Sequence, residues 1–150
     1  MELTILGCHS ATPRQNFHTT SQLLNFKNHL FMIDCGEGTQ IRLREEKINF
    51  SKIKYIFISH LHGDHFYGLI GLINTFKLLG RKVDLNIYGP LGIKEIILLQ
   101  MKLSKSRTEF KLTFFEESDS ISILFFMILI SLLLESYSFD WTAKLDLKGL

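Results

Sequence analysis

Residues 53–65 read IKYIFISHLHGDH, and this stretch sets the interpretation of the whole chain. β-Branched and aromatic side chains alternate through residues 53–59, which predicts a buried central strand. His60, His62, Asp64 and His65 follow, so four potential metal ligands lie within six residues. Residues two apart on an extended chain face the same side, so His60 and His62 can hold one ion. Asp64 and His65 then turn toward a second position.

The ligand types predict the chemistry of this cluster. Zinc takes imidazole nitrogen and carboxylate oxygen, although manganese and iron accept the same ligands. Two ions about 3.5–4 Å apart can activate a bridging water and hold both reacting oxygens of a phosphodiester. Asp64 is therefore a candidate for metal binding and for proton acceptance. The alternative is a His-rich surface loop, which is disfavoured because the cluster follows a strand and precedes a helical pattern.

Outward from this stretch, the chain alternates between strand and helix patterns. Predicted strands cover residues 2–7, 21–27, 30–36, 53–59, 84–90 and 109–117, and predicted helices cover 37–47, 68–80 and 91–104. Residues 8–20 are predicted as a loop and residues 28–29 as a turn. Glu37 is expected near the start of the first helix, where it favours the helix dipole. This order predicts an α/β layered sandwich rather than an all-β barrel.

Length, composition and net charge limit the classes of protein to which the chain can belong. The 150 residues suit one compact domain, and 46% hydrophobic with 21% charged residues argues against global disorder. A net charge of +2 neither requires nor excludes a nucleic-acid partner. The two cysteines, Cys8 and Cys35, are too few for a disulfide framework and suit a reducing cytosol. We interpret both as buried small hydrophobic residues. The start, MELTILGCHS, shows no secretory signal.

Residues 121–134 read ISILFFMILISLLL, an apolar run of 14 residues that contains two serines. A membrane-spanning helix needs about 20 such residues. The flanking segments are acidic or neutral and give no positive-inside signal. We therefore expect a buried strand pair or core helix here, and no membrane association.

Four strings together resemble a known family. Residues 60–65 (HLHGDH) resemble the hallmark of the metallo-β-lactamase superfamily. Residues 7–13 (GCHSATP), 30–40 (LFMIDCGEGTQ) and 88–90 (YGP) resemble ribonuclease Z, the tRNA 3′-processing endonuclease family. The DCGEGTQ string beside the histidine motif is the most specific part. The resemblance covers residues 1–117 and implies the N-terminal half of a metallo-β-lactamase-like αββα sandwich.

The resemblance also implies roles for individual residues. His60 and His62 would bind one zinc ion, and Asp64 and His65 the other, with Asp64 as proton acceptor. Asp34 would lie beneath the site and orient a metal-bound histidine, the alternative being a strand-end cap. The first loop would approach substrate RNA through Arg14, Asn16 and His18. The alternative is that these three residues belong to a solvated loop with no role in binding.

For the complete family member, the resemblance implies an endoribonuclease with two zinc ions. Its substrate would be precursor tRNA, its assembly a homodimer and its location the cytoplasm. The runner-up interpretation is another metallo-β-lactamase-fold hydrolase, acting on a thioester, a lactam or a small phosphodiester. The third is a non-catalytic metal-binding fragment.

The resemblance ends near residue 117, and residues 118–150 are predicted to be a divergent hydrophobic tail. The family supplies two more histidines and a bridging aspartate from its second half, whereas no histidine follows His65 here. Four ligands leave each of two ions with about two, although a catalytic zinc normally has three plus water. We therefore expect an N-terminal fragment or frame-disrupted copy with impaired activity.

The remaining cationic and histidine residues are expected to have no part in the site. His9 and His29 are assigned no metal role, and His29 is placed in a turn facing solvent. Lys77, Arg81 and Lys82 form a small basic cluster. Such a cluster can meet phosphates, but a solvated face is the preferred interpretation.

Overall fold

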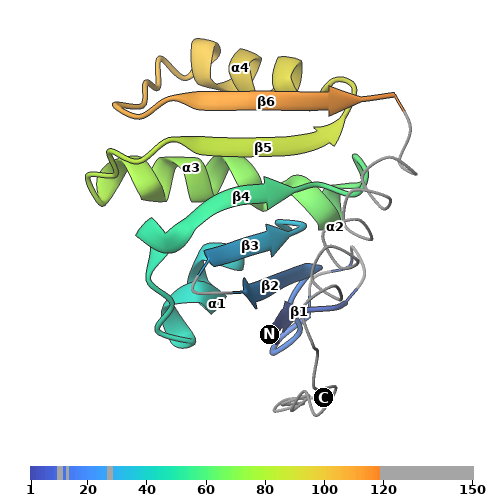
Figure 1. The fold of residues 1–150 in the computed structure, drawn as a ribbon. Coiled ribbons are helices and arrows are strands. Elements are labelled where there is room, and N and C mark those ends of the chain that lie inside the picture. The colour runs from blue at the N-terminus through green and yellow to red at the C-terminus, as the bar shows by residue number, and fades with distance from the viewer. Residues whose placement is uncertain (10–11, 13, 27–28, 119–150) are drawn as a thin grey trace, which may run out of the picture.

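The computed structural model describes residues 1–9, 12, 14–26 and 29–118. Within them, six strands form one sheet in the order β1-β2-β3-β4-β5-β6 (Figure 1). The strands are β1 (Glu2–Gly7), β2 (Ser21–Phe26), β3 (His29–Ile33), β4 (Ile53–Phe57), β5 (Leu85–Pro90) and β6 (Leu112–Glu117). β1, β2 and β3 are antiparallel neighbours, whereas β3 to β6 run parallel.

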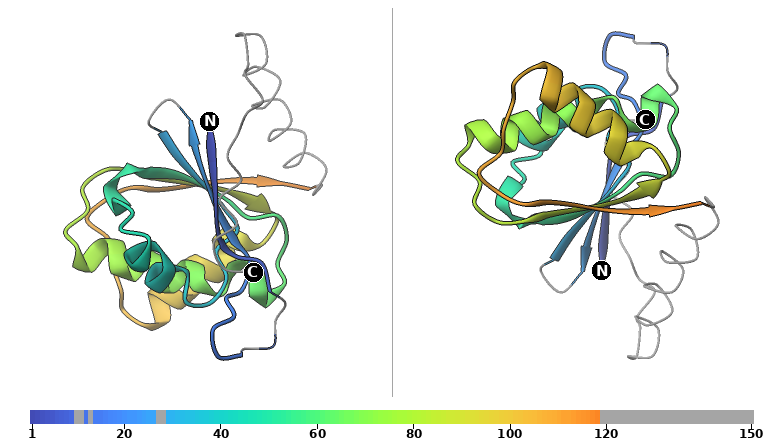
Figure 2. Two further views of the ribbon diagram at one scale, coloured as in Figure 1. Left: turned by 90° about the horizontal axis from the view of Figure 1, so that it is seen from below. Right: turned by 90° about the horizontal axis from the view of Figure 1, so that it is seen from above.

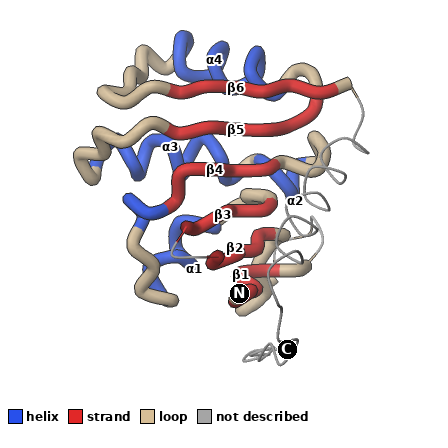
Figure 3. The backbone as a smooth tube through the Cα atoms, viewed as in Figure 1, coloured by secondary structure: helices blue, strands red, loops and turns tan. Residues whose placement is uncertain are grey.

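Helices connect the parallel strands, as crossover connections require. They are α1 (Thr39–Glu45), α2 (Gly63–Phe66), α3 (Gly68–Leu78) and α4 (Ile93–Leu103), with a short 3₁₀ turn η1 (Phe50–Lys52) before β4. α1, α3 and α4 all lie on one face of the sheet (Figures 2 and 3). The layered α/β prediction is therefore confirmed, although α2 was not predicted. Among the described residues, no helix is long and apolar enough to cross a membrane.

The hydrophobic core lies between the sheet and these helices. Alternate residues of β3 and β5 face the helices, so Leu30, Met32, Leu85 and Ile87 are buried. α3 meets them with the i, i+3, i+4 face of a helix, formed by Leu69, Leu72, Ile73 and Phe76. Burial of each such side chain stabilises the fold by roughly 1.5–3 kcal/mol.

Several predicted boundaries need correction. β3 ends at Ile33 rather than residue 36, because Asp34 adopts a left-handed conformation with φ of 57°. The first helix begins at Thr39, after Gly38 with φ of 77°. Glu37 therefore precedes the helix and is not in its first turn. β4 ends two residues earlier than predicted, and β6 begins three residues later.

Two smaller predictions were partly wrong. His29 is the first residue of β3 rather than part of a turn, although it is exposed as expected. Cys35 is fully buried, as predicted, but Cys8 is exposed. Burial is the main cause that raises the pKa of the Cys35 thiol to about 12, so this thiol stays protonated at neutral pH. The apolar run 121–134 lies outside the described residues.

Arg81 contradicts the solvated-cluster interpretation, because it is only 7% exposed. Its guanidinium lies over the Phe76 ring, 4.6 Å from the ring centroid. The same group donates hydrogen bonds of 2.6–3.2 Å to four backbone carbonyls, those of Phe50, Ile53, Val83 and Asp84. Arg81 thus joins η1, the start of β4 and the turn before β5 from inside the fold.

We expect Arg81→Met to lower the free energy of unfolding by about 2–4 kcal/mol, because it leaves buried carbonyls without donors. Lys82→Met is the matched control, since Lys82 is exposed and pairs with the equally exposed Glu109. The control should not change stability measurably. Urea denaturation followed by circular dichroism measures both. Equal losses for the two variants would contradict a structural role for Arg81.

Candidate functional site

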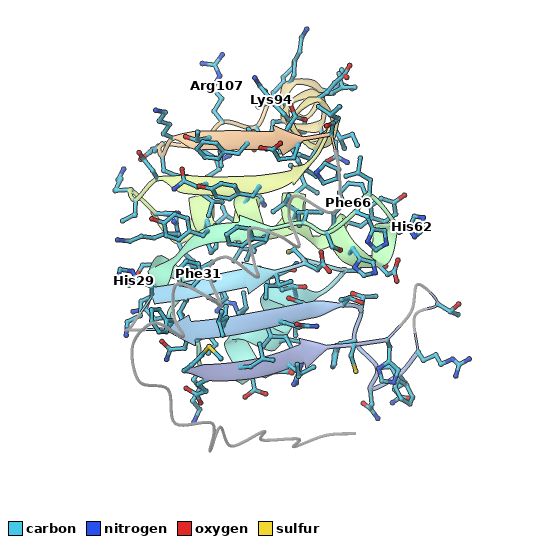
Figure 4. The ribbon with its side chains drawn as sticks, turned by 45° about the vertical axis from the view of Figure 1, so that its right-hand side comes forward. His29, Phe31, His62, Phe66, Lys94 and Arg107 are labelled. Atoms are coloured by element: carbon cyan, nitrogen blue, oxygen red, sulfur yellow. The ribbon has the colours of Figure 1, made fainter. Side chains whose placement is uncertain are left out.

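The histidine motif lies at the carboxyl end of β4, where parallel α/β sheets commonly place their sites. Beyond β4, Ile58 stays attached to the sheet through a 2.8 Å hydrogen bond from its N–H to the Tyr88 carbonyl. The chain then continues through the histidines into α2, to the right of β4 in Figure 1. Figure 4 shows His62 at the opposite end of the molecule from His29.

Asp34 lies beneath the motif and is only 4% exposed. Its Oδ1 accepts a 2.8 Å hydrogen bond from the Ser59 N–H. Its Oδ2 accepts from the Ser59 hydroxyl at 2.9 Å and lies 2.8 Å from His65 Nδ1. The left-handed backbone of Asp34, tolerated by a short polar residue, turns the chain so that the carboxylate meets the end of β4.

These contacts fix the tautomers of two histidines. An ionised carboxylate only accepts, so His65 must carry its proton on Nδ1. The single Ser59 hydroxyl proton goes to Asp34, so the 2.9 Å contact with His60 Nδ1 requires His60 to donate. In the neutral form of each ring, Nε2 then keeps its lone pair free. Sequence reasoning assigned no role to Ser59, although its place directly before His60 was the available signal.

The four motif side chains gather at one place. The ring centroids of His60 and His65 are 3.9 Å apart, and those of His60 and His62 are 4.6 Å apart. Asp64 Oδ2 lies 3.6 Å from His65 Nε2. Desolvation, followed by the charges of His65 and His62, lowers the pKa of His60 below its ordinary value. A lower pKa favours the neutral imidazole that a metal ion needs.

The donor set suits a divalent ion in its chemistry, because it offers neutral imidazole nitrogens and a carboxylate. The described part of the chain does not complete a metal site, however, since no group of three or more His, Cys, Asp or Glu residues in it could hold an ion. The residues thus fit part of a metal centre.

The turn that follows Asp34 fixes the position of the motif by backbone contacts. The Cys35 N–H donates to the His65 carbonyl at 2.7 Å, and the Gly68 N–H donates to the Cys35 carbonyl at 2.9 Å. A Cβ on Gly68 would lie 1.8 Å from the Gly36 carbonyl oxygen. Only glycine at position 68 allows the turn to approach the junction of α2 and α3 this closely.

The predicted substrate loop lies beside this turn. Among the described residues, no hydrogen bond, ion pair or ring contact joins Arg14, Asn16 or His18 to the histidine motif. Arg14 and Asn16 are exposed, and His18 is partly buried. The loop end is anchored by Thr19, whose hydroxyl donates to the Glu37 carbonyl at 3.0 Å. The structure therefore brings His60, His62, Asp64 and His65 together over Asp34, and leaves the loop residues at the periphery.

Comparison with solved structures defines the class of protein. The chain is similar to human tRNase Z, short form, with a TM-score of 0.73 and 38% identity over 77% of this chain and 45% of that chain. It is also similar to YhfI of Bacillus subtilis, a metallo-β-lactamase fold protein, with a TM-score of 0.58 and 25% identity. This match covers 78% of this chain and 46% of YhfI. The fold is that of the N-terminal part of a metallo-β-lactamase-like protein, as predicted.

A family model described as anti-Pycsar protein Apyc1 matches residues 1–121, so the chain belongs to this family. Curated relatives carry the name Ribonuclease Z, which confirms the resemblance found in the sequence. The relative from Bacteroides fragilis is 49% identical over 115 residues, or 77% of this chain and 38% of the relative. The relative from Bacteroides thetaiotaomicron is 50% identical over 77% of this chain and 36% of the relative. The chain therefore spans less than two-fifths of the length of these relatives.

We expect Asp34→Asn to move the His65 proton from Nδ1 to Nε2, because the new amide N–H₂ donates where the carboxylate accepted. Long-range ¹H–¹⁵N NMR of the imidazole rings measures the tautomer directly. His29, exposed at the other end of β3, serves as the internal control and should not change. A His65 spectrum unaffected by the substitution would contradict the role assigned to Asp34.

We expect Gly68→Ala to lower the free energy of unfolding by about 2 kcal/mol or more, since the new methyl group meets backbone. Gly71→Ala in the same helix is the matched control. Its nearest neighbour would be the flexible Gln40 side chain at 3.2 Å, so the better helix propensity of alanine should leave stability unchanged or raise it by up to about 1 kcal/mol. Thermal denaturation compares the two variants. Similar stabilities of Gly68→Ala and Gly71→Ala would contradict the close approach of the turn after Asp34 to Gly68.

Proposed function

We propose that this chain carries part of the catalytic centre of a zinc-dependent endoribonuclease that removes the 3′ trailer from precursor tRNA. The observation that supports it most is the network through which Asp34 and Ser59 present the Nε2 atoms of His60 and His65 at one strand end. Likeness to proteins named Ribonuclease Z and to human tRNase Z supports the choice of substrate.

In this proposal His60 and His62 hold one zinc ion, and Asp64 and His65 hold the other. When bound, such a pair of ions polarises a phosphodiester and makes water more acidic. Asp64 contributes a carboxylate that accepts a proton at Oδ2. Asp34 and Ser59 hold the imidazoles in the tautomer that ligation requires. The loop residues Arg14, Asn16 and His18 contact the RNA.

The proposal includes reduced activity for this chain. Residues 1–117 act as the N-terminal half of the site, and residues 118–150 form a divergent tail that adds no histidine. Two protein ligands for each ion are fewer than a catalytic zinc normally has, so both sites should be weak. The assembly is proposed to be a homodimer, supported by the exposed apolar side chains of Leu98, Leu99 and Leu103 on α4. The free thiols of Cys8 and Cys35 support a cytoplasmic location.

Two observations favour other candidates. The matched family model is described by a name other than ribonuclease Z, which favours as the second candidate another metallo-β-lactamase-fold hydrolase, acting on a thioester, a lactam or a small phosphodiester. The third candidate is a metal-binding fragment without catalysis. It is favoured because the described residues contain no complete group of metal ligands.

The test joins residues 1–117 of this chain to the remainder of the Bacteroides fragilis relative. We expect the chimera to cleave precursor tRNA, and Asp64→Ala to reduce its kcat by about 10²–10⁴-fold because the proton acceptor is lost. Asp84→Ala is the control, since Asp84 is exposed, lies before β5 and keeps its backbone carbonyl for the hydrogen bond with Arg81. The 150-residue chain should bind fewer than two zinc ions and cleave far more slowly than the chimera.

Three outcomes would contradict the proposal. A folded, zinc-loaded chimera that hydrolyses a thioester, a lactam or a small phosphodiester but not precursor tRNA would favour the second candidate. A folded chimera that cleaves neither substrate would favour the third. Full activity in the Asp64→Ala chimera would remove Asp64 from the mechanism.

A further inference from the structure

Three buried hydroxyl groups donate hydrogen bonds to backbone carbonyls of the turn that carries Asp34. The donor and acceptor pairs are Ser21 to Asp34 at 3.1 Å, Thr39 to Gly36 at 2.7 Å and Thr19 to Glu37 at 3.0 Å. Apart from Arg81, the buried polar side chains of the described residues are Asp34 and these three donors. Burial of a hydroxyl is unfavourable unless it is hydrogen-bonded, so the turn is the reason that all three are tolerated inside the fold.

Of the three donors, Ser21 acts on Asp34 itself. The antiparallel register that pairs Gln22 with Ile33 places Ser21 opposite Asp34, where the left-handed backbone ends β3. Ser21 is 1% exposed and lies two positions before Leu23 on the buried face of β2, where an apolar residue would be expected. Its hydroxyl supplies a hydrogen-bond donor at the point where the ladder between β2 and β3 stops.

The backbone of Asp34 is held on both sides of its Cα atom. Its N–H donates to the Phe57 carbonyl at 2.7 Å, and its carbonyl accepts from the Ser21 hydroxyl. The first contact restrains φ and the second restrains ψ, so together they fix the direction of the Asp34 side chain. A left-handed conformation is unfavourable for a residue with a Cβ atom and persists only where its surroundings hold it.

We propose that Ser21 is a positioning residue for His65, because its hydroxyl holds Asp34 in the conformation in which one carboxylate meets both Ser59 and His65. The contacts run from Ser21 Oγ to the Asp34 carbonyl, and from the Asp34 carboxylate to the Ser59 N–H and His65 Nδ1. The inference rests on the proposed function, in which His65 binds a metal ion. Replacing groups that orient such histidines typically changes metal affinity by about 10–100-fold.

The alternative is that the Ser21 hydroxyl only stabilises the turn, and Thr39 provides the matched control for that role. Thr39 is 2% exposed and its hydroxyl donates within the same turn. Its acceptor, the Gly36 carbonyl, also accepts from the Thr39 N–H at 3.3 Å. Removal of the Thr39 hydroxyl therefore leaves that carbonyl with a donor and leaves both backbone contacts of Asp34 in place.

The test is amide hydrogen exchange by NMR in the metal-free chain of 150 residues, with Ser21→Ala compared with Thr39→Val. The quantity measured is the exchange rate of the Ser59 N–H, which donates to Asp34, divided by that of the Ile58 N–H, which donates to the Tyr88 carbonyl. A general loss of stability changes both rates together, whereas local opening changes their ratio. We expect Ser21→Ala to raise the ratio about tenfold and Thr39→Val to leave it unchanged.

The tautomer of His65 is the second measurement, made at a pH where the ring is neutral. We expect Ser21→Ala, but not Thr39→Val, to move part of the proton from Nδ1 to Nε2, because the carboxylate that accepts from Nδ1 is no longer held. If Ser21→Ala does not fold, Ser21→Cys carries both measurements, since it keeps the size of the side chain and a weaker donor.

The proposal is overturned if a folded Ser21 variant leaves either measurement unchanged, or if Thr39→Val changes both as much as the Ser21 variant does. Neither measurement needs zinc or RNA. A chimera that folds but fails to cleave precursor tRNA would therefore count against the proposed function and not against the link between Ser21 and His65.

Discussion

The buried carboxylate of Asp34 is the interaction on which the site depends. It links two segments far apart in the sequence, the turn after β3 and the end of β4, through three contacts of 2.8–2.9 Å. A buried charge without partners would be strongly destabilising, so the turn and the motif must form together. The requirement that this carboxylate be satisfied therefore also orients the imidazoles. Structural stability and ligand geometry have the same physical cause here.

The sheet provides the frame for this interaction. β3 and β4 are parallel neighbours, so their carboxyl ends meet at one edge and bring Asp34 beside Ser59. Arg81 holds the opposite end of β4 by its bonds to the Phe50 and Ile53 carbonyls. β4 is thus fixed at both ends by polar side chains, while its middle is fixed by apolar packing of Ile56. A motif mounted on a strand held in this way has little freedom to move.

Much of the fold could be predicted from residue patterns, because strand and helix periodicities are local. The patterns of residues 53–59 and 68–80 depend on apolar residues repeating every two or every three to four positions, and both elements formed. Arg81 could not be predicted, since nothing local distinguishes a buried arginine from its exposed neighbour Lys82. Its burial depends on carbonyls that come from η1 and β4, about 30 positions earlier. The bridging role of Ser59 depends in the same way on Asp34, 25 positions away.

The most direct test of the central claim is X-ray absorption at the zinc edge on the zinc-loaded chain of 150 residues. If Asp34 and Ser59 present the Nε2 atoms for ligation, the spectrum should show nitrogen and oxygen ligands at about 2.0–2.1 Å with imidazole scattering. Replacement of His60 and His65 by glutamine should remove most of that scattering. A sulfur shell at about 2.3 Å, or imidazole scattering that persists in the double variant, would contradict the account.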